Sequence, residues 1–250
     1  MKALIPAAGL GKRWYPWSCV VPKELLPLGY YPAIHYVLEE AASAGIKEIG
    51  IIIREDKQLI RTYVGKIWQV NHPEVSIAWF YQLLPRGVAD ALLCAKDWAQ
   101  DEPTAVLYPD EIHSSKGGIV QLCREYKKSS GNWIGLTANK QKRRQGILKI
   151  EKIKKNVFQI YGFCNKKRLQ QIGYGTGRYI LGSGLEYLIK PLSQRRPRKG
   201  KELDDTNVFS PLWDQGIRGT ILHEPIFDIG TPENIYSIFS TLNIQRFTIR

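Results

Sequence analysis

The chain has 250 residues, of which 44% are hydrophobic and 24% are charged, values that are ordinary for a soluble globular protein. The length fits one large α/β domain, and no apolar run approaches the roughly 20 residues that span a bilayer, which excludes a membrane-spanning helix. The formal net charge of +13 is high and favours an anionic partner.

The first residues, MKALIPAAG, give way at once to glycine and charge, without the longer apolar stretch and cleavage site of a secretory signal. We therefore expect a cytoplasmic protein. The four cysteines, at positions 19, 94, 123 and 164, lie far apart and form no CxxC pair, so zinc-ligand spacing is absent. We expect reduced thiols that pack mostly as small apolar side chains.

Two segments concentrate the positive charge. Residues 140–155 carry eight Lys or Arg and one Glu, and residues 195–201 (RRPRKGK) carry five more. Three interpretations stay open: solvated segments, a patch for an anionic ligand or an anionic membrane surface, and a nucleic-acid site. Because no zinc-finger, KH or RNP motif accompanies the charge, we expect no nucleic-acid partner.

The chain begins with the pattern of a parallel βαβ unit. Residues 2–7 (KALIPA) and 48–53 (EIGIII) each have the pattern of a short buried strand. Between them, apolar side chains of residues 32–46 recur on one face of a helix, and Gly45 suits its C-terminal cap. Strand, loop, helix and strand in this order predict two neighbouring parallel strands.

The alternation of strands and helices continues along the chain. The next predicted elements are a helix over 58–70, a strand over 75–81, a helix over 87–99, a strand over 104–108, a helix over 119–128 and a strand over 133–138. Residues 146–153 and 156–163 then predict a β-hairpin with its turn at Lys-Lys-Asn. The remaining elements are a strand over 178–181, helices near 185–189 and over 205–214, a strand over 220–226 and a last helix after Thr231, with Pro232 in its first turn.

These elements predict an α/β fold with a mixed, mostly parallel sheet flanked by helices. The active site of such a sheet lies over the carboxyl ends of its strands.

The loop after the first predicted strand contains Gly9, Gly11, Lys12 and Arg13. Glycines at such a turn let backbone N–H groups face a phosphate, and the basic side chains supply positive charge. The spacing is neither that of a P-loop nor the GxGxxG of a dinucleotide fold, so the loop alone is a weak indication.

The residues that follow make the indication specific. The segment PAAGLGKR over residues 6–13 is followed by PKELLP over 22–27, PAI over 32–34 and AGI over 44–46. Over about the first 46 residues this order resembles the start of bacterial UTP–glucose-1-phosphate uridylyltransferases. These enzymes belong to the wider family of sugar-1-phosphate nucleotidyltransferases, which includes glucose-1-phosphate thymidylyltransferases.

Later landmarks continue the resemblance in the right order over about nine-tenths of the chain. They are Gln82 and Gly87, Tyr108-Pro109-Asp110-Glu111, Gly146, Lys166, Gly177-Arg178-Tyr179, Glu202 with Thr206, and Asp228-Ile229-Gly230. The resemblance implies a Rossmann-like fold of the nucleotide-diphospho-sugar transferase type. It also implies one domain over residues 1–250, with a nucleotide-binding half of about 1–140 and a sugar-binding half of about 141–250. The hairpin would belong to a small sugar-side β subdomain.

The resemblance also implies the role of each site residue. Arg13 and Lys23 would be catalytic, and Asp110 and Asp228 would ligate Mg2+ together with phosphate oxygens and water. Residues implied for the nucleotide are Ala7, Ala8, Gly9, Gly11, Lys12, Gln82 and Gly87. Residues implied for the sugar phosphate are Gly146, Asn165, Lys166 and Glu202. The small-molecule substrates would be an NTP and a sugar-1-phosphate, and the resemblance also allows for a homo-oligomer.

The implied reaction is Mg2+-dependent transfer of a nucleotidyl group from an NTP, with UTP favoured, to a sugar-1-phosphate, with glucose-1-phosphate favoured. Two alternatives stay open: transfer from dTTP to a hexose-1-phosphate, and a regulatory homologue that binds nucleotide or sugar with impaired catalysis. Departures from the family pattern motivate the second alternative. Lys12 replaces a threonine, Asn165 replaces a glutamate and Asn207 replaces an aspartate.

Overall fold

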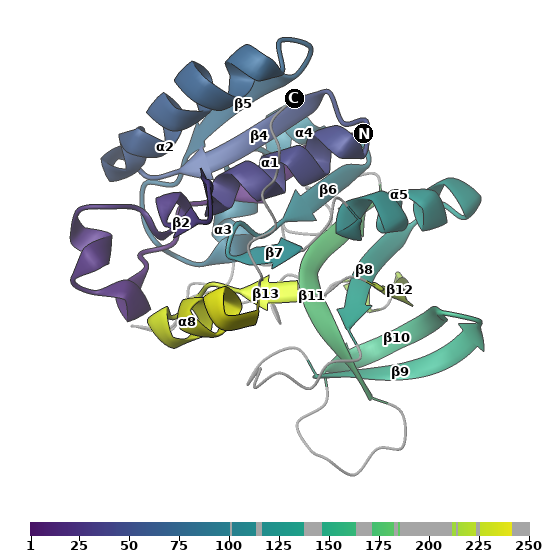
Figure 1. Cartoon of the computed structure of the whole chain (residues 1–250). Coiled ribbons are helices and arrows are strands. Elements are labelled where there is room, and N and C mark those ends of the chain that lie inside the picture. The colour runs from purple at the N-terminus through teal and green to yellow at the C-terminus, as the bar shows by residue number, and fades with distance from the viewer. Residues whose placement is uncertain are drawn as a thin grey trace.

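The computed structural model describes residues 1–100, 102–113, 117–137, 147–163, 172–182, 185, 212–213, 215–223 and 226–241. Within these residues, nine strands form one central sheet (Figure 1). In spatial order they are β5 (Ser76–Tyr81), β4 (Glu48–Ile53), β1 (Lys2–Pro6), β6 (Thr104–Leu107), β11 (Ile172–Leu181), β8 (Asn132–Thr137), β12 (Ile217–Ile221), β10 (Val157–Phe163) and β9 (Ile147–Lys154).

The direction of these strands confirms the predicted mixed, mostly parallel sheet. The strands β5, β4, β1 and β6 are parallel to one another, and β12 is parallel to β8. Of the nine described strands, β11 and β10 run against the others, because each pairs antiparallel with both of its neighbours in the sheet. Two small antiparallel pairs lie outside this sheet: β2 (Pro27–Leu28) with β3 (Tyr31–Pro32), and β7 (Glu111–His113) with β13 (Ile226–Asp228).

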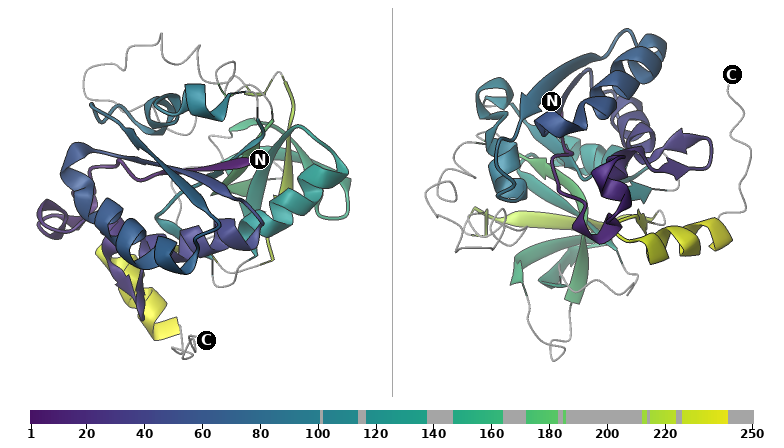
Figure 2. Two further views of the ribbon diagram at one scale, coloured as in Figure 1. Left: turned by 90° about the horizontal axis from the view of Figure 1, so that it is seen from above. Right: turned by 90° about the vertical axis from the view of Figure 1, so that its left-hand side faces the viewer.

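Helices cover both faces of the sheet. The described helices are α1 (Ala33–Ser43), α2 (Gln58–Tyr63), α3 (Val88–Leu93), α4 (Lys96–Ala99), α5 (Gly118–Lys128) and α8 (Pro232–Thr241). Single turns of 3-10 or π geometry lie at η1 (Lys12–Trp14), η2 (Trp17–Cys19), η3 (Lys23–Leu25), η4 (Glu55–Lys57), η5 (Val64–Trp68) and η6 (Gln69–Asn71). The left panel of Figure 2 shows the sheet between α1 and α2 on one side and α3 and α4 on the other.

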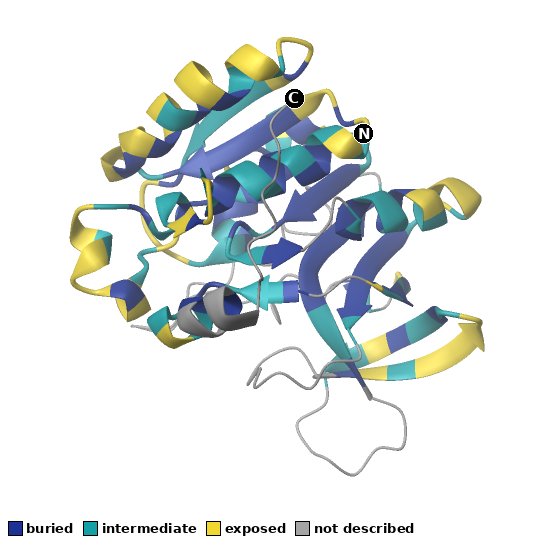
Figure 3. Cartoon of the chain, in the orientation of Figure 1, coloured by how far each residue is buried: buried dark blue, intermediate teal, exposed yellow. Residues whose placement is uncertain are grey.

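The alternation of side chains along a strand produces two apolar cores. In β1, Ala3 and Ile5 pack with α1, η5 and α5, whereas Leu4 between them packs with α3 and α4. Strands buried on both faces read as continuous apolar runs, as KALIP and EIGIII do. Figure 3 shows this burial in the central strands and shows that the edge strand β9 is largely exposed.

Most element predictions for the described residues are confirmed. The strand over 48–53 is β4, the hairpin is β9 and β10 with Asn156 at φ 60° in its turn, and α1 is followed by Gly45 at φ 80°. The last helix begins at Pro232, and Thr231 caps it by accepting a hydrogen bond from the Asn234 N–H at 3.4 Å.

Four element predictions are wrong in extent. The strand predicted over 178–181 begins six residues earlier, because β11 spans Ile172–Leu181. The predicted helix over 58–70 is α2 followed by η5 and η6, and the helix over 87–99 is interrupted between α3 and α4. The strand predicted over 220–226 is two strands: the chain leaves the sheet after Ile221, and β13 joins β7 instead. The sequence does carry a sign of this break, because His223, Glu224 and Pro225 separate the apolar residues of the two strands. The helices expected near 185–189 and over 205–214 fall outside the described residues except at 185, 212 and 213.

The thiols are less buried than expected. Cys123 is buried, but Cys19 and Cys94 are exposed, so the expectation of packed cysteines is wrong for two of the three described. No helix in the described ranges is long and apolar enough to cross a membrane.

Candidate active site

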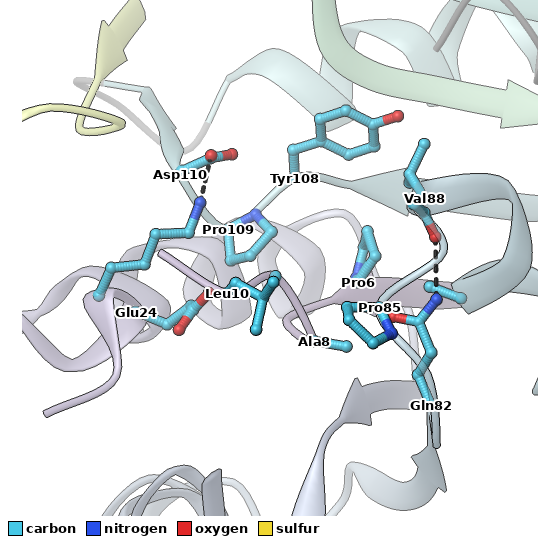
Figure 4. A pocket seen from close by; sticks show the side chains of 14 residues that line it. Pro6, Ala8, Leu10, Glu24, Gln82, Pro85, Val88, Tyr108, Pro109 and Asp110 are labelled. Carbon is cyan, nitrogen blue, oxygen red and sulfur yellow. Dashed lines mark hydrogen bonds and ion pairs between the residues drawn. The ribbon is translucent and has the colours of Figure 1, made fainter. Parts of the chain in front are cut away.

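A cavity of about 180 Å³ lies where β1 and β6 end at the same edge of the sheet (Figure 4). The strand order β5-β4-β1 reverses at β6, so this edge is the switch point at which doubly wound sheets form a crevice. Four segments line the cavity: the loop after β1, the η3 turn, the segment between β5 and α3, and the end of β6. The structure therefore brings together residues that are up to about 100 positions apart in the chain.

The loop after β1 offers backbone groups to the cavity. Ala7 and Ala8 are buried, whereas a side chain at Gly9 would meet no atom within 4 Å. Gly11 adopts a left-handed conformation, with φ at 65°, and a Cβ there would lie 3.1 Å from the Cβ of Ser18. The loop thus has an open face at Gly9 and a tight turn at Gly11, a shape that suits close approach of a phosphate.

The η1 turn directs Arg13 toward residues 228–230, near the C-terminal end of the sequence. Trp14 is buried, and its Nε1 donates a hydrogen bond of 2.9 Å to the Ile229 carbonyl. A Cβ built on Gly230 would lie 2.7 Å from an Arg13 guanidinium nitrogen and 2.8 Å from Asp228 Oδ1. Arg13 and Asp228 therefore face the same small space above Gly230. The Lys12 side chain, in the same turn, is exposed.

Lys23 and Asp110 form an ion pair in the wall of the cavity, as the dashed line in Figure 4 marks. Lys23 Nζ lies 2.5 Å from Asp110 Oδ2. Burial alone would raise the pKa of Asp110, but the charges of Lys23 and Arg13 hold it below its ordinary value. Burial would also lower the pKa of Lys23, and the carboxylates of Asp110 and Glu24 raise it above its ordinary value. Both groups are therefore charged at neutral pH.

The small β7–β13 sheet brings the two predicted metal aspartates together. Asp228 lies opposite Glu111 in this pairing, and the Ile229 N–H donates to the Asp110 carbonyl at 2.9 Å. The Gly230 N–H donates to Asp228 Oδ1 at 2.6 Å, which fixes that carboxylate. In the described part of the chain, no group of three or more His, Cys, Asp or Glu side chains could hold a metal by itself. Two carboxylates fit Mg2+ nonetheless, because this ion takes few protein ligands and completes its shell with phosphate and water oxygens.

Gln82 and Gly87 lie on the opposite wall, between β5 and α3. The buried Gln82 amide donates to the Gly87 carbonyl and to Asp90 Oδ2, both at 2.9 Å. Gly87 has φ at 105°, a conformation that favours glycine. These bonds fix the Gln82 side chain in the cavity wall.

The resemblance missed two buried ion pairs beneath these residues. Lys57 Nζ donates to both oxygens of Glu24 and to the Ala7 carbonyl, and Arg178 forms a bidentate pair with Glu40. Lys57 stands in the polar segment REDKQ, which reads as an exposed loop, so its sequence gives no signal. Arg178 stood out only as a member of the matching Gly177-Arg178-Tyr179 motif.

The Arg178 pair supports the loop that carries Asp110. Its guanidinium donates to the Tyr108 carbonyl at 3.0 Å and to the Glu111 carbonyl at 2.7 Å. Glu40 also accepts the Ile119 N–H at 2.7 Å, which ties this network to the start of α5. Burial would raise the pKa of Glu40, but Arg178 holds it below its ordinary value.

Of the predicted residues, Ala8, Gly9, Lys23, Gln82, Gly87 and Asp110 line the cavity. Arg13 and Asp228 lie on segments beside Asp110, because the charge of Arg13 acts on Asp110 and the residue after Asp228 is hydrogen-bonded to it. The sugar-phosphate residues Gly146, Asn165, Lys166 and Glu202 lie outside the described residues, as does Asn207. Of the basic segments, residues 147–155 are in the described hairpin, and 140–146 and 195–201 are not.

Comparisons with known proteins show the family of the chain and the similarity of its fold to solved structures. Residues 2–244 match the family model described as nucleotidyl transferase. The UTP–glucose-1-phosphate uridylyltransferase YngB of Bacillus subtilis is 27% identical, with 100% of this chain and 91% of that protein covered. A crystal structure of UDP-glucose pyrophosphorylase complexed with UDP-glucose superposes with a TM-score of 0.84 at 22% identity, covering 96% of this chain and 97% of that one. A Bacillus anthracis structure described as a glucose-1-phosphate thymidylyltransferase superposes with a TM-score of 0.81 at 23% identity and covers 100% of this chain and 98% of its own.

Proposed function

Because the chain belongs to the nucleotidyl transferase family, we propose that it is a sugar-1-phosphate nucleotidyltransferase that uses an NTP and releases pyrophosphate. UTP is the favoured donor and glucose-1-phosphate the favoured acceptor. The observation that carries the proposal is the Lys23–Asp110 pair in a cavity that is also lined by the open glycine loop. Since NTPs are cytoplasmic metabolites, the reaction belongs in the cytoplasm.

The chemistry of the reaction explains the residue types in the cavity. A phosphate oxygen of the sugar-1-phosphate attacks the α-phosphorus of the NTP, the bond between this phosphorus and the bridging oxygen breaks, and pyrophosphate leaves. The nucleophile is already an anion, so no general base is needed. What remains is to position two anions that repel each other and to stabilise charge as it moves to the leaving group.

The cations and backbone donors divide this task. The loop at Gly9 and Gly11 is open to the triphosphate, and Arg13 projects from the same loop. Lys23 is a charged ammonium whose side chain is largely buried, and its attraction for phosphate oxygens is stronger there than in bulk solvent. Transfer of this ammonium from Asp110 to the reacting phosphates places its charge where negative charge develops.

Asp110 and Asp228 would hold Mg2+ through their carboxylate oxygens. When bound, the ion neutralises charge on the phosphates and draws electron density toward the leaving pyrophosphate. With its carboxylate engaged in this way, Asp110 would release the Lys23 ammonium from the ion pair that it forms in this structure. The two roles are therefore compatible within one small site.

The preference for UTP and glucose-1-phosphate has two supports. The segments PAAGLG and PKELLP are closer to the uridylyltransferase pattern than to the thymidylyltransferase pattern. The name of the relative that covers the whole chain also describes a uridylyltransferase that acts on glucose-1-phosphate.

A substrate panel tests the proposal. Pyrophosphate release is measured with UTP, dTTP, CTP, ATP and GTP, each combined with several sugar-1-phosphates, with and without Mg2+. The proposal expects Mg2+-dependent release that is fastest with UTP and glucose-1-phosphate. Fastest release with dTTP would reassign the donor. Tight binding of NTP without turnover on any sugar phosphate would contradict the enzymatic function and favour a regulatory homologue.

A further inference from the structure

Two carboxylates line the cavity that we assign to a triphosphate, Asp110 and Glu24. Lys23 neutralises Asp110, and the proposed metal would do the same. Glu24 is different. Its side chain is fully buried, and Lys23, its neighbour in the chain, is already paired with Asp110. An unpaired negative charge at this position would repel the ligand that the cavity is built to bind.

Lys57 provides the counter-charge for Glu24 from outside the cavity. It is the last residue of η4, is only 5% exposed and is absent from the cavity lining. Its ammonium donates to Glu24 Oε2 at 2.8 Å, to Glu24 Oε1 at 3.0 Å and to the Ala7 carbonyl at 2.7 Å. An ammonium has three donors, so these bonds use all of them.

This arrangement links three segments of the site. The Glu24 carboxylate belongs to the η3 turn that carries Lys23, and Ala7 begins the glycine loop. In a planar trans peptide, the C=O and the next N–H point in opposite directions. Fixing the Ala7 carbonyl on Lys57 therefore directs the Ala8 N–H away from Lys57.

We propose that Lys57 is a positioning residue for nucleotidyl transfer, which neutralises Glu24 in the cavity wall and fixes the glycine loop through the Ala7 carbonyl. The inference rests on the proposed function for its turnover measurements. It assigns two separable effects to one side chain. Neutralisation of Glu24 affects the affinity for NTP, because an unpaired Glu24 carboxylate would repel the triphosphate in the ground state. Loop fixation acts on turnover, because it sets the geometry of the donors around the reacting phosphate.

Two variants separate these effects. Lys57→Met leaves the Glu24 charge unpaired and removes the donor to Ala7, and it should raise the KM for UTP by about 10- to 100-fold and lower kcat. The double variant Glu24→Gln with Lys57→Met removes both charges but still lacks the donor to Ala7. Its KM for UTP should return to within about threefold of wild type, while kcat stays at least about tenfold low.

Matched controls distinguish this role from a general structural one. Lys47→Met removes a surface lysine, 61% exposed and paired with Glu74 at 3.8 Å, and should leave both constants unchanged. Thermal unfolding of every variant is recorded in parallel. If Lys57→Met does not fold, the double variant decides the question, because it has no unpaired buried charge: a low kcat with a nearly normal KM supports the proposal.

Three results would overturn the inference: wild-type constants for Lys57→Met, recovery of kcat together with KM in the double variant, or a double variant whose KM stays as high as that of Lys57→Met. Failure of the proposed function is recognised separately, as wild-type protein that turns over no substrate pair. In that case the dissociation constant of Mg2+–UTP, measured by calorimetry, replaces KM. Weaker binding by Lys57→Met and recovery in the double variant would still support neutralisation, and equal binding by all three proteins would refute it.

Discussion

Individual charged side chains determine the electrostatics of the cavity, and Lys23 is the clearest case. Its ammonium lies 2.5 Å from Asp110 Oδ2, and its pKa is above the ordinary value because of Asp110 and Glu24, against the lowering effect of burial. In the function that we propose, this ammonium would lie beside the α-phosphate and would stabilise charge that develops in the transition state more than charge present in the ground state.

Removal of this charge should therefore act on turnover. We expect Lys23→Ala to lower kcat by about 100- to 1,000-fold with a modest change in the affinity for UTP. Steady-state kinetics and calorimetry with Mg2+–UTP measure the two effects, and Lys47→Ala is the control for loss of a surface lysine. A normal kcat would rule out a transition-state role for Lys23.

Asp228 is the second residue for which we propose a specific role, as a ligand of Mg2+. Its Oδ1 accepts the Gly230 N–H, and its segment is hydrogen-bonded to Asp110. We expect Asp228→Asn to raise the Mg2+ concentration for half-maximal rate by about tenfold or more, because the amide is a weaker ligand than the carboxylate. Asp97→Asn, at a side chain that is 92% exposed, is the control. Unchanged metal dependence would place the ligand elsewhere.

At the scale of single residues, the sequence indicated the proposed site residues more clearly than the buried residues that hold them in place. Lys23, Asp110 and Asp228 stand in motifs that match the family, and the structure brings them to one site. Lys57 stands in a charged segment that reads as a loop, and only the fold shows it buried against Glu24. A buried partner with no pattern of its own is visible only in three dimensions.

At the scale of elements, the loop between β13 and α8 sets the spacing between Arg13 and Asp228. A Cβ at Gly230 would lie within 2.8 Å of both side chains. Gly230→Ala should therefore displace them and lower kcat on the order of 100-fold, while urea unfolding shows little loss of stability. Gly65→Ala is the control, because a Cβ there meets nothing within 4 Å. Wild-type kinetics for Gly230→Ala would show that this spacing does not matter.

The Glu40–Arg178 pair joins α1 and β11 beneath the Asp110 loop. Both side chains are almost fully buried, so Arg178→Met should leave an unpaired charge and reduce the free energy of unfolding by about 3–5 kcal/mol at pH 7. The double variant Arg178→Met with Glu40→Gln should recover part of this loss. Because Arg178 lowers the pKa of Glu40 from its ordinary 4.5, against the raising effect of burial, this contribution is present above that pH and lost as pH falls through the lowered value.

Urea unfolding of wild type and Arg178→Met at a series of pH values measures this dependence. The difference between the two proteins should shrink as the pH falls below about 4.5. A difference that is constant from pH 7 to acid would mean that the charge of Glu40 is not what Arg178 stabilises.

Elements differ in how well the sequence predicts them. Strands β1 and β4 follow from continuous apolar runs, because both of their faces are buried. The pairs β2–β3 and β7–β13 were missed, because strands of two or three residues have too few side chains to show a period. Yet β7–β13 is the pairing that carries Asp228 to Asp110, so a missed element determines the proposed metal site.

At the scale of the whole molecule, the sheet topology and the family resemblance indicate the same edge of the sheet as the proposed nucleotide site. The reversal of strand order at β6 creates the crevice, and Gly9, Lys23, Gln82 and Asp110 of the described motif residues line it. The net charge of +13 belongs to this scale as well, since it favours approach of anionic substrates without specifying which ones.

Binding of the donor should be visible in the stability of the whole protein. At a UTP concentration about 100 times the dissociation constant, Mg2+–UTP should add about 2.7 kcal/mol to the free energy of unfolding, which corresponds to a rise in Tm of about 5–10 °C. Lys23→Ala should keep most of this shift. A thermal scan measures it, and an equal shift with uridine would contradict binding through the phosphates.

The central claim is that this cavity transfers a nucleotidyl group with release of pyrophosphate, and the fate of labelled phosphate tests it most directly. UTP labelled at the α- or the γ-phosphate is incubated with glucose-1-phosphate, Mg2+ and either wild type or Lys23→Ala. We expect wild type to move the α-label into the nucleotide sugar and the γ-label into pyrophosphate, and Lys23→Ala to do so at least about 100-fold more slowly. Recovery of the γ-label as orthophosphate, or equal rates for the two proteins, would contradict this claim.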